Sequence, residues 1–309
     1  MRRAFAHTLT ELAHKDPRIV LMTADLGFMV LEEFSESHPD RFFNVGVAEA
    51  NMVGLATGLA ASGFIPFIYS IATFASMRGY EQIRNGPVLH ELPVRIVGVG
   101  GGFEYGHAGI THHALEDLAL ARVQPGLTVI APGDHRQAAA ALADTYQLPG
   151  PIYYRFGKRD DYELPRLDGR FRLGRTEILQ EGDDLLIITL GALSSEAVLA
   201  ARLLGNRGIE TTVALVSSLQ PPPWDDIQSL IGKFPVALTV EEHYPEGGLG
   251  SMVCEIAAGI GASCRVLRCA VGTSPGSYFG GERYLREANG LTGQGICATA
   301  LKALGVHDA

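Results

Sequence analysis

Short apolar runs rich in β-branched residues alternate along this chain with longer segments whose apolar residues recur at helical spacing. Strand–helix alternation of this kind predicts an α/β fold, in which a mostly parallel sheet carries helices on both faces. In the first half, the pattern predicts strands over 19–25, 42–46, 64–70, 94–100, 127–134 and 151–157, and helices over 3–14, 48–61, 73–85, 112–122 and 135–147.

A change of composition divides the chain of 309 residues into two such blocks. Residues 158–172 are charged and contain a proline and a glycine, which is typical of a linker. We therefore expect two α/β domains, 1–165 and 172–309, each with a mostly parallel sheet flanked by helices. In the second block the expected strands are 185–191, 209–219, 236–242 and 264–272, and the expected helices are 194–206, 224–232 and 251–260.

Charge and cysteine usage exclude several classes of function. The net charge is −9 and no run of Lys or Arg occurs, so we expect no binding to nucleic acid. Residues 51–77 carry no charge, but SGFIP at 62–66 interrupts them, so we predict a helix and a strand and no membrane segment. The four cysteines form no CxxC pair, which favours reduced thiols and a cytoplasmic protein.

Candidate ligand groups follow the predicted strands of the first block: Asp25, residues 46–49, residues 100–112 and Arg155. Carboxyl ends of parallel strands meet at one edge of a sheet, so these groups are expected to form one site. The glycines of GVGGGFEYG (98–106) fit neither a dinucleotide nor a P-loop pattern.

Histidines and a carboxylate cluster just after these glycines, in residues 107–116. His107, His112, His113 and Glu116 allow a zinc site or, alternatively, histidines at an exposed helix start. On a helix the adjacent His112 and His113 would diverge by about 100°, which disfavours a shared metal ion.

A more specific resemblance is carried by several motifs in a fixed order. RFFNVGVAEANMVGLATGLAASGFIPF (41–67) resembles the pyrimidine-binding domain of the transketolase family. YEQIRN (80–85), the G-x-x-G-x-T-H pattern at 106–112, LTVIAPGD (127–134) and YYRFG (153–157) follow in the order of that family. ALTVEEHYPEGGLGSMVCEIA (237–257) is similar to the C-terminal domain of transketolases. The chain therefore resembles the C-terminal half of a transketolase, as in split transketolases.

The resemblance implies thiamine diphosphate as the cofactor, which supplies a carbon nucleophile. Glu49 matches the family glutamate that hydrogen bonds to N1′ of the aminopyrimidine, where it acts in acid–base catalysis. Phe74 matches the aromatic residue that packs on the pyrimidine, and Ile71 stands where the family usually has a second aromatic. Asp25 matches a carboxylate near the cofactor. Without the resemblance, Glu49 is an ordinary first-turn glutamate and Phe74 an ordinary core residue.

The same resemblance assigns substrate contacts. His112 matches the histidine that faces the substrate, and His113 stands beside it where glutamine is common. Arg155 matches the arginine that holds a terminal phosphate, the alternative being a salt bridge to an acidic neighbour. Ala108 and Gly100 replace two polar residues that contact the donor in transketolases. Their loss favours a less hydroxylated donor, such as pyruvate, or an unusual sugar.

The chain lacks the diphosphate-binding half of such an enzyme. GDD (182–184) and GDH (133–135) do not continue into the G-D-G … N motif that holds the metal. We therefore expect a partner, an N-terminal transketolase-like subunit that carries Mg²⁺ and the diphosphate site, in an α2β2 assembly. The expected activity is transfer of a two-carbon ketol or acyl unit between carbonyl or sugar-phosphate substrates. The alternatives are the beta subunit of a 2-oxo acid dehydrogenase or decarboxylating ligase, and a non-catalytic regulatory subunit.

Overall fold

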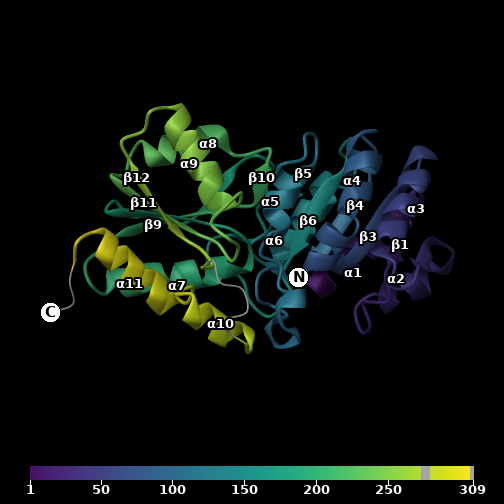
Figure 1. Cartoon of the computed structure of the whole chain (residues 1–309), viewed down its shortest axis with the longest axis horizontal. Coiled ribbons are helices and arrows are strands. Elements are labelled where there is room, and N and C mark those ends of the chain that lie inside the picture. The colour runs from purple at the N-terminus through teal and green to yellow at the C-terminus, as the bar shows by residue number, and fades with distance from the viewer. Residues whose placement is uncertain (273–278, 307–309) are drawn as a thin grey trace.

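The computed structural model describes residues 1–272 and 279–306, and in it two sheets lie side by side along the long axis of the molecule (Figure 1). The first sheet has seven strands in the order β10-β5-β6-β4-β3-β1-β2, all parallel to their neighbours except β10. These strands are β1 (Ile19–Thr23), β2 (Phe42–Asn44), β3 (Ile65–Ile71), β4 (Arg95–Val99), β5 (Thr128–Ile130), β6 (Ile152–Phe156) and β10 (Ser218–Gln220).

Helices cover both faces of the first sheet, which explains why the central strands β1, β3 and β4 are buried throughout and mostly apolar. One layer contains α1 (Arg2–Lys15), α2 (Glu32–Ser37) and α6 (His135–Thr145). The other contains α3 (Glu49–Ala61), α4 (Tyr80–Ile83) and α5 (Asp117–Arg122). Short turns complete this domain: η1 (Pro39–Arg41), η2 (Phe74–Arg78), η3 (Arg84–Val88), η4 (Gly106–Ala108) and η5 (Ile110–His112).

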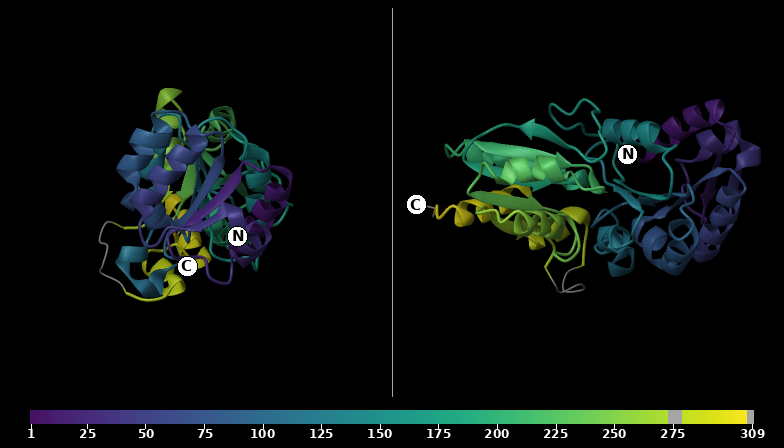
Figure 2. Two further views of the ribbon diagram at one scale, coloured as in Figure 1. Left: turned by 90° about the vertical axis from the view of Figure 1, so that its right-hand side faces the viewer. Right: turned by 90° about the horizontal axis from the view of Figure 1, so that it is seen from above.

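The second sheet has five strands in the order β12-β11-β8-β9-β7, and only β7 is antiparallel to its neighbour. Its strands are β7 (Thr176–Gln180), β8 (Leu185–Thr189), β9 (Thr211–Val216), β11 (Val236–Val240) and β12 (Arg265–Cys269). Two helical layers enclose it (Figures 1 and 2), with α8 (Trp224–Ile231) and α9 (Leu249–Gly259) on one face, and η6 (Gly191–Leu193), α7 (Ser194–Gly205), α10 (Glu282–Ala288) and α11 (Gly293–Ala303) on the other. The predicted α/β fold with two mostly parallel sheets is confirmed.

Several element boundaries differ from the sequence pattern. The run 209–219 forms two strands, β9 and β10, and β10 leaves the second sheet to pair with β5 of the first. The helix predicted over 112–122 begins only at Asp117, after the 3-10 turn η5. The helix predicted over 73–85 is divided into η2, α4 and η3, because two turns are widened to π-helical spacing.

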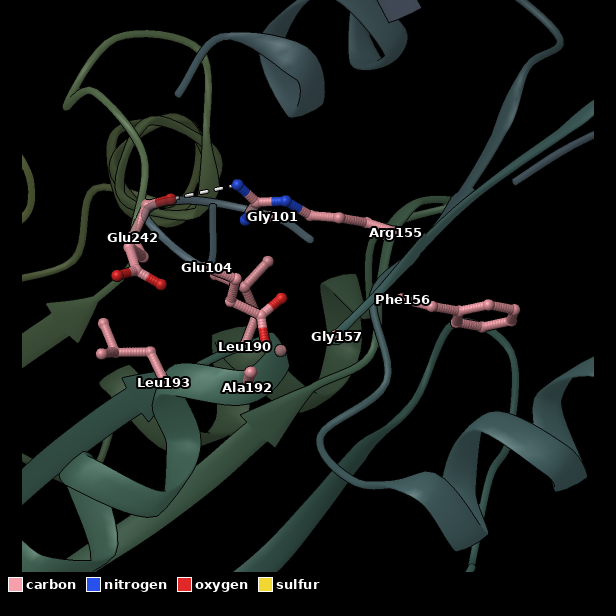
Figure 3. Close-up of a pocket in the computed structure, with 10 residues that line it drawn as sticks. Gly101, Glu104, Arg155, Phe156, Gly157, Leu190, Ala192, Leu193 and Glu242 are labelled. Carbon is pink, nitrogen blue, oxygen red and sulfur yellow. Dashed lines mark hydrogen bonds between the residues drawn. The ribbon is translucent and has the colours of Figure 1, made fainter. Parts of the chain in front are cut away.

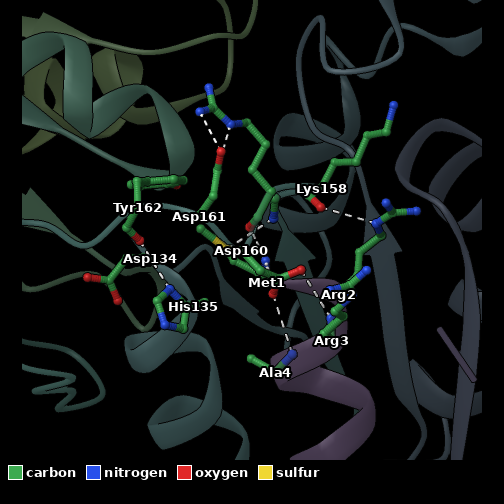
Figure 4. Close-up of polar contacts among 12 residues, drawn as sticks. Met1, Arg2, Arg3, Ala4, Asp134, His135, Lys158, Asp160, Asp161 and Tyr162 are labelled. Atoms are coloured by element: carbon green, nitrogen blue, oxygen red, sulfur yellow. Dashed lines mark hydrogen bonds and ion pairs between the residues drawn. The ribbon is translucent and has the colours of Figure 1, made fainter. Parts of the chain in front are cut away.

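Residues 158–172, the expected linker, are fastened to the first domain (Figure 4). Arg2 Nε donates to the carbonyl of Lys158 at 3.1 Å, and two first-turn amides of α1 donate to the Asp160 carboxylate at 3.3 and 3.4 Å. The hydroxyl of Tyr162 donates to a backbone carbonyl before α6 at 2.8 Å. The segment is therefore a fixed connection between the sheets.

The uncharged stretch 51–77 contributes most of α3 and the whole of β3, separated by a turn. Among the described residues, no helix combines the length and the apolar character that a membrane span requires.

Candidate active site

Glu49 is the first residue of α3, and its carboxylate is buried at the carboxyl edge of the first sheet with 3% exposure. Gly46, at φ +74°, turns the chain from β2 into this helix. Arg78 Nη1 lies 3.1 Å from both carboxylate oxygens, and Ser70 Oγ, near the end of β3, donates to one of them at 3.5 Å. A buried carboxylate requires such a partner, and the helix N-terminus adds a favourable field.

Two aromatic rings lie beside this carboxylate. Phe74 begins η2, three residues after the end of β3, and the guanidinium carbon of Arg78 lies 3.7 Å from the centre of its ring. His112, in the turn η5, meets Phe74 edge to face with 5.0 Å between the ring centres. The fold therefore brings Glu49, Phe74 and His112 together through Arg78, although they are far apart in sequence.

Ile71 and Asp25 lie at the carboxyl ends of the neighbouring strands β3 and β1. Ile71 ends β3, and its side chain is buried. Asp25 follows β1 with φ at +57°, and it is exposed. Its conformation is held by Asn44, whose Nδ2 donates to Asp25 Oδ1 at 3.1 Å and whose Oδ1 accepts from the Asp25 amide at 3.0 Å.

His113 lies on the far side of the loop from His112 and is buried. Its ring meets Phe103 edge to face at 5.2 Å, and Nε2 lies 3.4 Å from the carbonyl of Gly106. Burial lowers the pKa of His113. The neighbouring His112 contacts Phe74 instead. Within the described ranges, no group of three or more His, Cys, Asp or Glu side chains is placed to hold a metal ion.

Arg155 is also buried away from Glu49, at the junction of the two sheets, with 7% exposure. Its Nε lies 3.0 Å from Asp117 Oδ2, and Nη2 donates to the backbone carbonyl of Glu242 at 3.1 Å (Figure 3). The structure thus shows the alternative arrangement for this residue, a salt bridge to an acidic neighbour. His113 and Arg155 are not brought together with Glu49, Phe74 and His112, so their predicted substrate contacts stay predictions.

A buried ionic cluster at the junction has no counterpart in the sequence analysis. Arg286 of α10 donates to both oxygens of Glu242, which follows β11, at 2.7 and 2.8 Å, and it lies 2.8 Å from Glu282. Glu104, in the loop after β4, lines a cavity of about 20 Å³ together with Arg155 and Glu242 (Figure 3). That volume is about enough for one water molecule.

Stability is expected to fall as pH rises from about 4.5 to about 7, because burial raises the pKa of Glu104 from 4.5 to about 7. Below this range the carboxyl is protonated in both the folded and the unfolded chain. Within it only the folded chain keeps the proton, so each rise in pH favours unfolding. Above about pH 7 the loss is complete, and the free energy of unfolding is lower by about 1–3 kcal/mol.

Urea unfolding at about pH 5 and about pH 8 measures this dependence. Glu104→Gln should be more stable than the wild type at the higher pH and should show a flatter profile. The pKa of buried Glu241 is also raised to about 7, so the difference between the two proteins, and not the wild-type slope, isolates Glu104. Identical profiles would contradict the prediction.

The glycines of GGLG (247–250) serve a structural purpose at the start of α9. Glu241 accepts from the amides of Leu249 and Gly250 at 2.7 and 2.8 Å. A Cβ at Gly248 would lie 2.0 Å from Glu241 Oε2, so only glycine lets the carboxylate approach. The chain's own carboxylate therefore fills the anion-binding end of this helix.

Sequence patterning missed the part that Arg78 plays beside Glu49. From its place in the sequence, Arg78 is expected to hold helices together or to lie in a subunit interface. The available signal was its spacing of four residues from Phe74, which brings two side chains to one side of a helical segment. The Glu49 contact itself links residues 29 positions apart and becomes visible only in the folded chain.

The fold and the site define a two-domain α/β chain with a buried carboxylate and an aromatic ring at a strand-end edge. Two protein-family models match the sequence of this chain. The model described as "Transketolase, pyrimidine binding domain" matches residues 1–161, and the model described as "Transketolase, C-terminal domain" matches residues 174–283. The chain belongs to the transketolase family.

Three relatives show how much of such proteins the chain covers. It is 35% identical to a subunit of the apulose-4-phosphate transketolase of Phocaeicola vulgatus, over 97% of this chain and 96% of that protein. It is 36% identical to the 1-deoxy-D-xylulose-5-phosphate synthase of Syntrophotalea carbinolica, over 96% of this chain but 46% of that protein. A solved structure described as "Split gene transketolase, inactive beta4 tetramer" superimposes with a TM-score of 0.88, at 35% identity and over 99% of both chains. The chain thus covers nearly the whole length of the apulose-4-phosphate transketolase subunit and about half the length of the synthase.

Proposed function

We propose that this chain is the pyrimidine-binding subunit of a split, thiamine diphosphate-dependent transketolase-like enzyme that transfers a two-carbon ketol or acyl unit. The observation that carries the proposal is the buried carboxylate of Glu49 beside the ring of Phe74, with His112 in contact with that ring. An acid in a desolvated site and a flat apolar surface are what an aminopyrimidine ring requires.

Thiamine diphosphate, when bound, supplies the carbon nucleophile. This chain's own residues supply the rest of the chemistry at the pyrimidine end. Glu49 would hold and move a proton at N1′, Phe74 would pack on the ring, and Ile71 would contribute an apolar side chain to the cofactor site. His112 is partly exposed and is placed to hydrogen bond to substrate oxygens.

The proposal includes an N-terminal partner subunit that holds Mg²⁺ and the diphosphate, in an α2β2 assembly. Support comes from apolar side chains exposed on and near the elements that carry Asp25 and Glu49, because large exposed apolar residues mark interaction surfaces. They are Phe28, Met29, Phe43, Val47 and Leu55, of which Phe28 and Met29 are 74% and 83% exposed. The name of the solved relative suggests that this chain, too, forms an inactive homo-oligomer when its partner is absent.

A particular observation bears on the donor. A Cβ at Gly100, where φ is +77°, would lie 2.1 Å from the ring of Tyr105, so a polar side chain does not fit there without rearrangement. Ala108 likewise offers no polar group. Both favour a less hydroxylated donor, and they keep the beta subunit of a 2-oxo acid dehydrogenase or decarboxylating ligase as the second candidate.

Reconstitution tests the proposal. The chain alone should not turn over substrate, and addition of a partner subunit with thiamine diphosphate and Mg²⁺ should produce activity. Assays of the complex with xylulose 5-phosphate and with pyruvate distinguish the two candidates, and omission of the cofactor is the control. Turnover by the isolated chain, or cofactor-independent turnover by the complex, would refute the proposal.

A further inference from the structure

We propose that Arg78 occupies the aminopyrimidine position in the cofactor-free chain and must leave it before the cofactor binds. Arg78 would thereby set the apparent affinity for thiamine diphosphate. This inference rests on the proposed function and concerns the state of the site before loading.

The guanidinium of Arg78 contacts both Phe74 and Glu49, the two side chains that the proposed function assigns to the aminopyrimidine ring. Arg78 lies over Phe74, with 3.7 Å between the guanidinium carbon and the ring centre. The same guanidinium donates to both oxygens of Glu49 at 3.1 Å. A guanidinium is planar, stacks on aromatic faces and presents N–H donors at its edge. An aminopyrimidine is also planar, also stacks on aromatic faces, and is expected to hydrogen bond through N1′ to the same carboxyl, so the two cannot use Phe74 and Glu49 at once.

The side chain is free to leave. Arg78 is 44% exposed, whereas Glu49 is 3% exposed, so solvent is available to the arginine and not to its partner. Across the described ranges, the guanidinium of Arg78 hydrogen bonds only to Glu49. Rotation into solvent therefore breaks the ion pair with Glu49 and the cation–π contact with Phe74, and no other hydrogen bond of the guanidinium among the described residues.

One of the protein's own side chains can occupy a ligand site for most of the time. The apparent affinity for the ligand is then the intrinsic affinity multiplied by the fraction of time that the site is open. A half-exposed ion pair and a cation–π contact are each modest, and together they are expected to reduce the open fraction about tenfold. Removing the arginine should recover that factor.

The test is calorimetric titration of thiamine diphosphate, with Mg²⁺ present, into the reconstituted complex. Arg78→Met should bind the cofactor about 5–20-fold more tightly than the wild type. Arg18→Met is the matched control, because Arg18 is 52% exposed and pairs with buried Asp16. That pair precedes β1, at the opposite edge of the sheet, and its removal should leave the affinity unchanged.

A second background separates competition from other effects. In Glu49→Gln the arginine has lost its charged partner, so adding Arg78→Met should change the affinity by less than about threefold. Arg78→Gln serves as a second variant if Arg78→Met fails to assemble, and sedimentation confirms that the complexes are intact.

Equal or weaker binding by the Arg78 variants would overturn the inference and leave the proposed function standing. If the wild-type complex binds no thiamine diphosphate, the proposed function fails and this inference fails with it.

Discussion

Glu49→Gln is expected to lower kcat of the reconstituted complex by about 10²–10⁴-fold. The amide keeps the size of the side chain and its place at the start of α3, but it cannot exchange a proton with the cofactor ring. The expected defect is therefore in turnover, with little loss of assembly. Steady-state kinetics at saturating thiamine diphosphate measure it.

Glu81→Gln is the matched control, because Glu81 is an exposed glutamate on α4 in the same domain. It should retain wild-type kcat within about twofold. The near-ultraviolet circular dichroism of the bound cofactor should also change in Glu49→Gln and stay unchanged in the control. A Glu49→Gln complex with more than about a tenth of wild-type kcat would remove this carboxyl from the proposed chemistry.

Arg286→Met is expected to destabilise the chain by about 3–5 kcal/mol, because it leaves buried carboxylates without their cation. Arg286 binds both oxygens of Glu242, and these two side chains are 7% and 5% exposed. Glu282 loses the same partner. Urea unfolding at neutral pH measures the change.

Two further variants define the cause. Glu242→Gln combined with Arg286→Met should recover part of the loss, because it removes the stranded charge. Arg283→Met is the exposed counterpart, since Arg283 is 90% exposed and pairs with Glu287 on the same helix. Its effect should be below about 1 kcal/mol. An Arg286→Met protein as stable as the Arg283 variant would show that the junction does not depend on this ion pair.

The central strands could be predicted because both faces of each sheet are covered, so that burial makes these strands predominantly apolar. The runs 94–100 and 185–191, for example, contain β4 and β8. The edge strands carry a weaker signal, because β7 is only partly buried and β10 is both partly buried and only three residues long. The membership of β10 in the first sheet follows from its pairing with β5, a contact between distant residues.

The candidate site was predictable to a similar degree. Glu49, Phe74 and His112 follow different strands of one parallel sheet, and the topology brings them together. Their chemical roles stay predictions. For Arg155 the sequence allowed a salt bridge to an acidic neighbour but did not identify that neighbour, because Asp117 and the carbonyl of Glu242 reach this side chain only in the folded chain.

By itself, the order of apolar runs and motifs determined the α/β architecture and the membership of the transketolase family. Only the tertiary structure decided which charges meet: Arg78 with Glu49, Arg155 with Asp117 and Arg286 with Glu242. The physical reason is that the two kinds of feature depend on residues at different separations in the sequence. Burial periodicity is expressed over a few neighbouring residues, whereas an ion pair depends on a distance of about 3 Å between side chains that are distant in sequence.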